Sequence, residues 1–95
     1  MPTVNSIING AFTVGTTAMK LSEAAGQSTQ GLSNGVTIKA DTGIAGTIYV
    51  GGVGVTTATG FPLTAGQAIT LESLQAQTVY VIASQAAQTG RFIGT

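Results

Sequence analysis

The chain has 95 residues, no cysteine and only six charged side chains, three basic and three acidic, so its net charge is zero. Three basic residues cannot neutralise a run of phosphates, which disfavours nucleic-acid binding. A hydrophobic content of 43% with 6% charged residues is also the opposite of a disordered composition. The sequence therefore predicts a small folded domain that associates with other subunits, because little charge keeps neutral molecules apart.

The N-terminal part of the sequence carries no targeting signal that we can identify. No apolar run approaches the ~20 residues of a membrane-spanning helix. No basic residue precedes Lys20 and no long apolar region follows the start, so we expect no secretory signal peptide. We therefore expect no membrane partner, and a molecule that works where it is made or inside a larger assembly.

Residues 1–15 alternate weakly between apolar and polar types and are interrupted by Asn9-Gly10. This pattern predicts an extended N-terminal arm or an edge strand. The arm would precede a single β-sandwich domain over residues 16–95, and it could reach a neighbouring subunit and become ordered on binding.

Residues 16–26 have two interpretations. They are rich in helix formers, with Thr17 as a possible N-cap and Gly26 as a possible stop. Met19 and Leu21 also alternate with polar residues, as in a half-buried strand. The alternation favours the strand, and the short helix stays open.

Short alternating segments, separated by turns rich in glycine, follow from residue 36 onward. They predict strands at 36–41, 47–50, 54–57, 68–72, 78–84 and 90–94. Pro62 cannot donate a ladder hydrogen bond, so the segment around it predicts a corner. Strands at this spacing predict an all-β fold, either a small antiparallel β-sandwich or a jelly-roll-like barrel.

Two of these segments raise further expectations. Residues 78–84 are β-rich, uncharged and free of proline, so we expect a central strand or one covered by a partner. The pattern Thr-Ile-Tyr-Val at 47–50 recurs as Thr-Val-Tyr-Val at 78–81. Two similar stacked hairpins would produce this repeat, and so would chance among β-favouring residues.

The glycine-rich stretch at 46–60 does not match a phosphate-binding loop. A dinucleotide fingerprint needs a strand, then G-x-G-x-x-G, then a helix. Gly52 and Gly54 begin that pattern, but Thr57 stands at the position of the final glycine. We therefore assign these glycines to turns and bulges.

The side chains that most enzymes use are missing. There is no histidine and no cysteine, which removes the commonest general base and the strongest nucleophile. Glu23, Asp41 and Glu72 are scattered along the chain, and Asp41 is two residues from Lys39, where we expect a solvated ion pair. We expect no enzyme activity, no cofactor, no metal and no small-molecule substrate.

The aromatic residues and one C-terminal segment are candidates for binding. Tyr49 and Tyr80 could stack on a sugar, or they could pack in the core or an interface. Phe61 is interpreted as a corner plug. Arg91 beside Phe92 has a composition that interfaces favour, although a last core strand would look the same. The candidate interface residues are Ile7, Ile8, Phe12, Tyr49, Phe61, Tyr80, Arg91 and Phe92.

Several short motifs resemble small structural proteins of tailed bacteriophages. They are Val-x-Ile-Lys-Ala at 36–40, Ile-Tyr-Val-Gly at 48–51, Gly-Phe-Pro-Leu at 60–63 and Tyr-Val-Ile at 80–82. The resemblance implies a capsid decoration or cement protein of the virion, a homotrimer on the capsid surface that binds the major capsid protein and is assembled in the host cytoplasm. The alternatives are a tail, neck or baseplate component and a small carbohydrate-binding or adhesin module.

Overall fold

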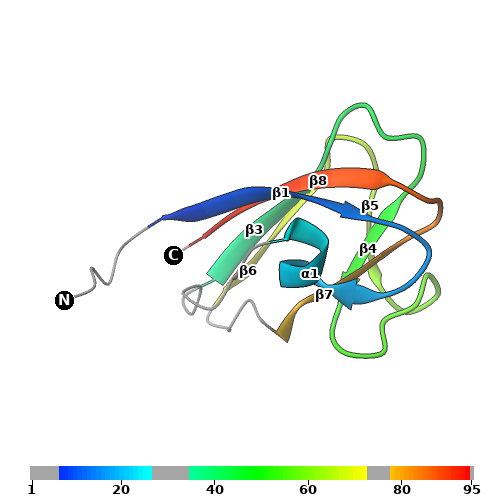
Figure 1. Cartoon of the computed structure of the whole chain (residues 1–95), viewed down its shortest axis with the longest axis horizontal. Helices are drawn as coiled ribbons and strands as arrows, with labels where there is room; N and C mark the ends of the chain where they lie inside the picture. Colours follow the sequence, from blue (N-terminus) through cyan, green and yellow to red (C-terminus); the bar gives the residue numbers. More distant parts are fainter. Residues whose placement is uncertain (1–6, 27–34, 73–77, 95) are drawn as a thin grey trace.

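Two four-stranded antiparallel sheets pack face to face in the computed structural model of the chain, which describes residues 7–26, 35–72 and 78–94 (Figure 1). The strands are β1 (Ile8–Val14), β2 (Met19–Lys20), β3 (Gly35–Ala40), β4 (Ile48–Gly51), β5 (Phe61–Leu63), β6 (Ala68–Glu72), β7 (Tyr80–Ala83) and β8 (Gln88–Gly94), and the helix α1 is Leu21–Ala25. No described helix has the length and hydropathy to cross a membrane.

Sheet A has the strand order β1-β8-β3-β6, and sheet B has the order β2-β7-β4-β5. The chain changes sheet at every connection except the one between β4 and β5. This is the arrangement of an eight-stranded jelly roll, a double-sheet fold made of two Greek keys. The predicted all-β sandwich is confirmed.

The period of two in the sequence determines which side chains fill the space between the sheets. In β3, Val36, Ile38 and Ala40 are buried, while Thr37 is half-buried and Lys39 is exposed. Ile69 and Leu71 of β6 likewise pack against the core. Each aliphatic side chain buried in this way contributes about 1.5–3 kcal/mol to folding. The burial of these inward-facing side chains is therefore a main source of the stability of the sandwich.

The expected N-terminal arm is part of the sandwich where the structure describes it. Ile8–Val14 forms the edge strand β1 and pairs with β8 along its whole length, from Ile8 opposite Gly94 to Val14 opposite Gln88. Figure 1 shows these first and last strands side by side. Residues 1–6 lie outside the described part of the chain. Residues 8–14 therefore form an edge strand and not an extended arm.

Residues 16–26 contain both structures that the sequence left open. The two residues Met19–Lys20 form β2, and α1 follows at once. Glu23 accepts a hydrogen bond from the backbone N–H of Lys20 at 3.1 Å, which closes the first turn. Gly26 ends the helix with φ 68° and ψ 22°, a left-handed conformation that glycine adopts without strain. The favoured strand is thus wrong beyond Lys20.

Two other segments also differ from the expectation. Residues 54–57 form no strand and lead into a turn at 57–59. In this turn the Thr56 hydroxyl accepts from the N–H of Ala58 at 3.2 Å, and the Thr59 hydroxyl accepts from the N–H of Thr56 at 3.1 Å. Pro62, expected at a corner, lies inside β5. An edge strand tolerates proline because one of its sides needs no ladder donor.

The segment at 78–84 provides β7, which lies between β2 and β4 as the prediction of a central strand required. The two parts of the apparent repeat do not form stacked hairpins. They are neighbours within sheet B, with Val50 opposite Val81.

Candidate self-association surfaces

The eight predicted interface residues are spread over several parts of the molecule. Phe12 and Phe92 are core residues, each only 2% exposed. They face inward because both occupy the buried positions of their strands, so the free molecule presents neither side chain at its surface. Ile8 is half-buried against the same core, whereas Ile7 is 65% exposed and lies just before β1.

The two tyrosines lie on neighbouring strands of sheet B. Tyr49 is opposite Ile82, and Tyr80 is opposite Gly51, so the tyrosines are diagonal neighbours on the outer face. Both are half-buried. A Cβ on Gly60 would lie 2.6 Å from the Cβ of Tyr49, so the end of the glycine-rich loop packs directly on this tyrosine. The glycine is thus needed for close packing of the loop on the sheet.

Phe61 does not plug a corner but lies on the edge strand β5, where it is 55% exposed. Pro62 beside it lacks a backbone donor, which weakens this edge as a template for another strand. The opposite edge of sheet B is β2, which has only two residues. Both edges of sheet B are therefore poor sites for pairing.

The edges of sheet A are different. Strand β1 has seven residues with neither charge nor proline, and β6 has five residues with a single charge at Glu72. Long uncharged edge strands present unpaired N–H and C=O groups to any chain that can pair with them. Sheet A therefore has the two longer edge strands of the described molecule, of which β1 is also contacted by α1.

The outer face of sheet A is organised in rows that cross the four strands. The cation row consists of Ala11, Arg91, Lys39 and Ala68. The middle row consists of Asn9, Ile93, Thr37 and Thr70. The acidic row consists, among the described residues, of Gly35 and Glu72.

A hollow of about 440 Å³ lies over the cation and middle rows of this face. The alanines Ala11 and Ala68 leave space on either side of the two long cations. Ile93 adds an apolar side chain that is 49% exposed, and the hydroxyls of Thr37 and Thr70 are 2.9 Å apart across β3 and β6. The face thus combines one exposed apolar side chain, Ile93, with two positive charges at one end.

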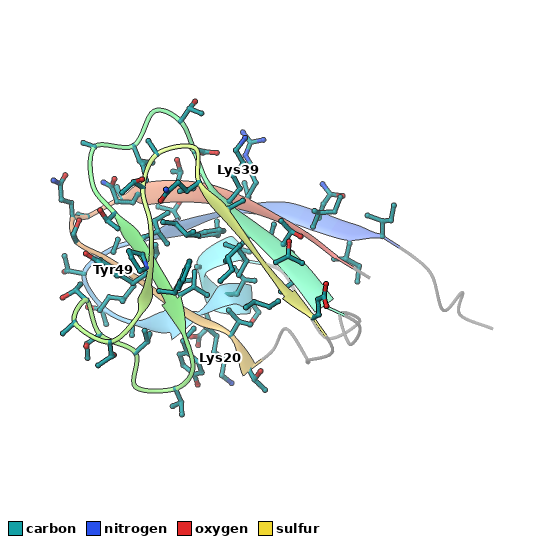
Figure 2. The ribbon with its side chains drawn as sticks, turned by 180° about the vertical axis from the view of Figure 1, so that it is seen from behind. Lys20, Lys39 and Tyr49 are labelled. Carbon is teal, nitrogen blue, oxygen red and sulfur yellow. The ribbon has the colours of Figure 1, made fainter. Side chains whose placement is uncertain are left out.

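The charges at this end do not pair as the sequence suggested. Arg91 Nε lies 3.8 Å from Asp41 Oδ1, and the Thr89 hydroxyl donates to Asp41 Oδ2 at 2.7 Å. Asp41 therefore pairs with Arg91 and not with Lys39. Lys39 stands directly opposite Arg91 in the ladder, an arrangement of like charges that costs stability. Figure 2 shows Lys39 and Lys20 on opposite sides of the molecule, so no other lysine shares this face.

Sequence reasoning missed most of this face, including Thr37, Ala68 and Glu72. The available signal was the outward set of positions in β3, β6 and β8, which the alternation identifies as solvent-facing. The alternation does not determine which strands are neighbours in the sheet. Because Lys39 and Arg91 are far apart in the chain, only the sheet order places them together.

The described residues contain no group of three or more histidine, cysteine, aspartate or glutamate side chains that could hold a metal ion. The features that the structure does bring together are two long edge strands and one weakly charged face with an exposed isoleucine, Ile93, at its centre. They define a class of protein: a small jelly-roll module whose surfaces are suited to contact with other protein chains.

Comparison with known proteins gives one informative match. No protein-family model matches the sequence, and no curated protein matches it. The fold is similar to a solved structure of Bacillus endospore appendages, described as a novel family of disulfide-linked pili, with a TM-score of 0.53 and 24% sequence identity. The match covers 93% of this chain and 80% of that chain. At this identity the likeness establishes a common fold.

This match overturns the resemblance to bacteriophage proteins. The predictions of a capsid decoration protein, of a tail or baseplate part, of the major capsid protein as partner and of a virion location are wrong, because the match over 93% of the chain is with a pilus structure. The motifs that suggested a virion are the strand and turn patterns of a jelly roll. Such patterns specify a fold, and one fold serves many functions.

Proposed function

We propose that this chain is a structural subunit of a self-assembling extracellular fibre of the pilus type, with no enzymatic role. The observation that carries the proposal is the shared fold with the endospore appendage structure over 93% of the chain. The residues agree with it, since six charged side chains and no histidine or cysteine favour contact between copies over chemistry. The partner is another copy of the same chain.

The edges of sheet A support an open assembly. A strand from one copy can extend the sheet of another by hydrogen bonds along an exposed edge. β1 and β6 are at opposite edges of the same sheet. If β1 of one copy pairs with β6 of the next, the row of copies still has an unpaired edge strand at each end. A head-to-tail contact that does not close on itself produces a filament. A closed trimer, which the sequence analysis expected, is therefore less suited to these edges.

One feature separates this chain from the protein that it matches. The pili of that structure are described as disulfide-linked, but the 95 residues here contain no cysteine. Contacts made through these residues therefore contain no disulfide. Their strength has to come from backbone hydrogen bonds and from apolar burial, at about 25 cal/mol per Å² of apolar surface removed from water.

The test is assembly of the purified chain, followed by negative-stain electron microscopy and sedimentation. We expect filaments of uniform width that pellet at high speed, and we expect monomer to decrease as concentration rises. A protein that stays monomeric at every concentration, or that forms only amorphous aggregates, would contradict the proposal.

A further inference from the structure

We propose that two copies of the chain pair back to back through the outer faces of sheet A, turned end for end, so that Glu72 of each copy lies beside Lys39 of the other. The inference rests on the proposed function and deepens it, because it names a second contact between copies besides the strand edges. That contact would join subunits of adjacent fibres side by side.

The geometry follows from the three rows of the face. Successive rows are two residues apart, about 6.6 Å along the strands. A half-turn about an axis that runs along the middle row, across the strands, places the acidic row of one copy over the cation row of the other. Each strand then lies over the same strand of its partner. A two-fold contact of this kind is self-complementary, so every contact forms twice.

The sizes of the side chains are complementary under this half-turn. Glu72 of one copy comes over Ala68 of the other, so this long side chain enters the hollow beside the cations. In the opposite sense, Lys39 meets Gly35, which has no side chain. Large groups thus face small ones at these positions.

The charges are complementary as well. Among the described residues, the ion pair of the face is Arg91 with Asp41, which leaves Lys39 and Glu72 without an ionic partner in their own copy. Both are exposed and lie at opposite ends of the same face. The half-turn brings each of them to the oppositely charged residue of the other copy and offsets the repulsion between Lys39 and Arg91.

The apolar part of the face supplies the burial. Ile93 lies in the middle row, so it meets Ile93 of the other copy, and both are 49% exposed in the free molecule. Four strands about 4.8 Å apart with about six residues each cover roughly 400 Å² in projection. This is small beside the ~800 Å² per partner of a standard interface. A single pair is therefore weak, and many pairs along two fibres act together.

The contact can be trapped by cross-linking, because the chain contains no native cysteine. Thr37 lies in the middle row, so under the half-turn it comes over Thr37 of the other copy. We expect the T37C variant, treated with a short bismaleimide, to give a covalent dimer on a denaturing gel. The matched control is T57C, since Thr57 is exposed in the loop after β4 and away from this face.

The charges are tested in the T37C background. K39E or E72K alone sets like charges against each other in both copies of the contact, and we expect at least about tenfold less cross-linked dimer at low salt. An equimolar mixture of the two variants should recover the dimer, because every opposed pair then has opposite signs again. Damage to folding within one chain would not be repaired by mixing.

Cross-linking of T37C that is no stronger than that of T57C overturns the pairing. So does a yield that K39E leaves unchanged, or a mixture that recovers nothing. Electron microscopy of the same samples separates this inference from the proposed function. Filaments without the cross-link would refute the pairing alone, whereas the cross-link without filaments would refute the fibre.

Discussion

Gly90 shows how closely sheet A is packed around a single residue. It lies opposite Phe12, and a Cβ at this position would come within 2.5 Å of the Phe12 ring and 2.6 Å of the Lys39 carbonyl oxygen. The ring of Phe12 therefore occupies the place of a side chain on β8. Glycine is required here for space, not for an unusual backbone angle.

We expect Gly90→Ala to destabilise the fold by about 1–3 kcal/mol, because the added methyl group forces either the ring or the β3 backbone to move. Urea unfolding followed by circular dichroism measures the loss. Gly43→Ala is the matched control, since nothing lies within 4 Å of a Cβ at that position. Equal stability of the two variants would contradict this account of Gly90.

Gln88 is a buried polar residue of the core. Its side-chain oxygen accepts from the N–H of Gly46 at 2.8 Å, and its amide nitrogen donates to the Ala86 carbonyl at 2.9 Å. It thereby joins the loop before β4 to the start of β8. A buried amide is retained at low cost when both of its ends are hydrogen-bonded.

Gln88→Ala should cost about 1–3 kcal/mol of folding free energy, because the Gly46 N–H loses its acceptor in a part-buried site. The chemical denaturation midpoint is the measurement. Gln85→Ala removes the same side chain from an exposed position and should change stability by less than about 0.5 kcal/mol. A Gln88 variant as stable as the Gln85 control would show that these hydrogen bonds contribute little.

Among the structural elements, the edge strands distinguish the two sheets. Sheet B ends in a strand of two residues on one side and in a strand that contains Pro62 on the other. Sheet A ends in β1 and β6, which have neither feature. If fibres grow by strand pairing, sheet A is the sheet that grows.

Thr13 offers a direct test of this element. It is exposed on β1, one row beyond the cation row, so it lies outside the proposed face contact. A lysine on an edge strand opposes pairing with a further strand. We expect Thr13→Lys to keep the fold and to slow filament growth strongly, as measured by light scattering, whereas Thr57→Lys should assemble normally. Filament growth by Thr13→Lys at the native rate would exclude the β1 edge.

The elements also show how far the sequence could be interpreted. Strands β3, β6 and β7 were predictable because their apolar residues alternate or form a short uncharged run. β5 was hidden because proline usually ends a strand and is tolerated only at an edge, which is a property of the sheet and not of the segment. Residues 19–26 were ambiguous because their side chains suit both a strand and a helix. The cation row was unpredictable because it depends on strand order.

On the scale of the whole molecule, the distribution of charge and the lack of cysteine define how copies can associate. The chain is neutral, with three positive and three negative side chains, and forms no disulfide through these residues. Association therefore depends on hydrogen bonds, apolar burial and a few ion pairs. These forces respond to denaturant and, at the ion pairs, to salt.

Filaments of this chain should accordingly persist in an excess of dithiothreitol and dissolve in urea without it. Side-by-side association of filaments should decrease as salt is raised, while single filaments remain. Sedimentation and electron microscopy of parallel samples measure both effects. Loss of single filaments on reduction alone would mean that a covalent bond from another source holds the subunits together.

The pairing of β1 with β8 has a consequence for how the molecule is made. Strand β1 is paired with β8 in sheet A, so it finds this neighbour only when β8 has been synthesised, about 75 residues later in the chain by their positions in the sequence. Contacts between distant parts of a chain form slowly, and until then β1 has no strand of sheet A to pair with. A chain truncated before Gln88 should therefore stay unfolded by circular dichroism and seed no fibre. Growth from the β1 edge is thus delayed until β8 has been made, a consequence of the strand order alone.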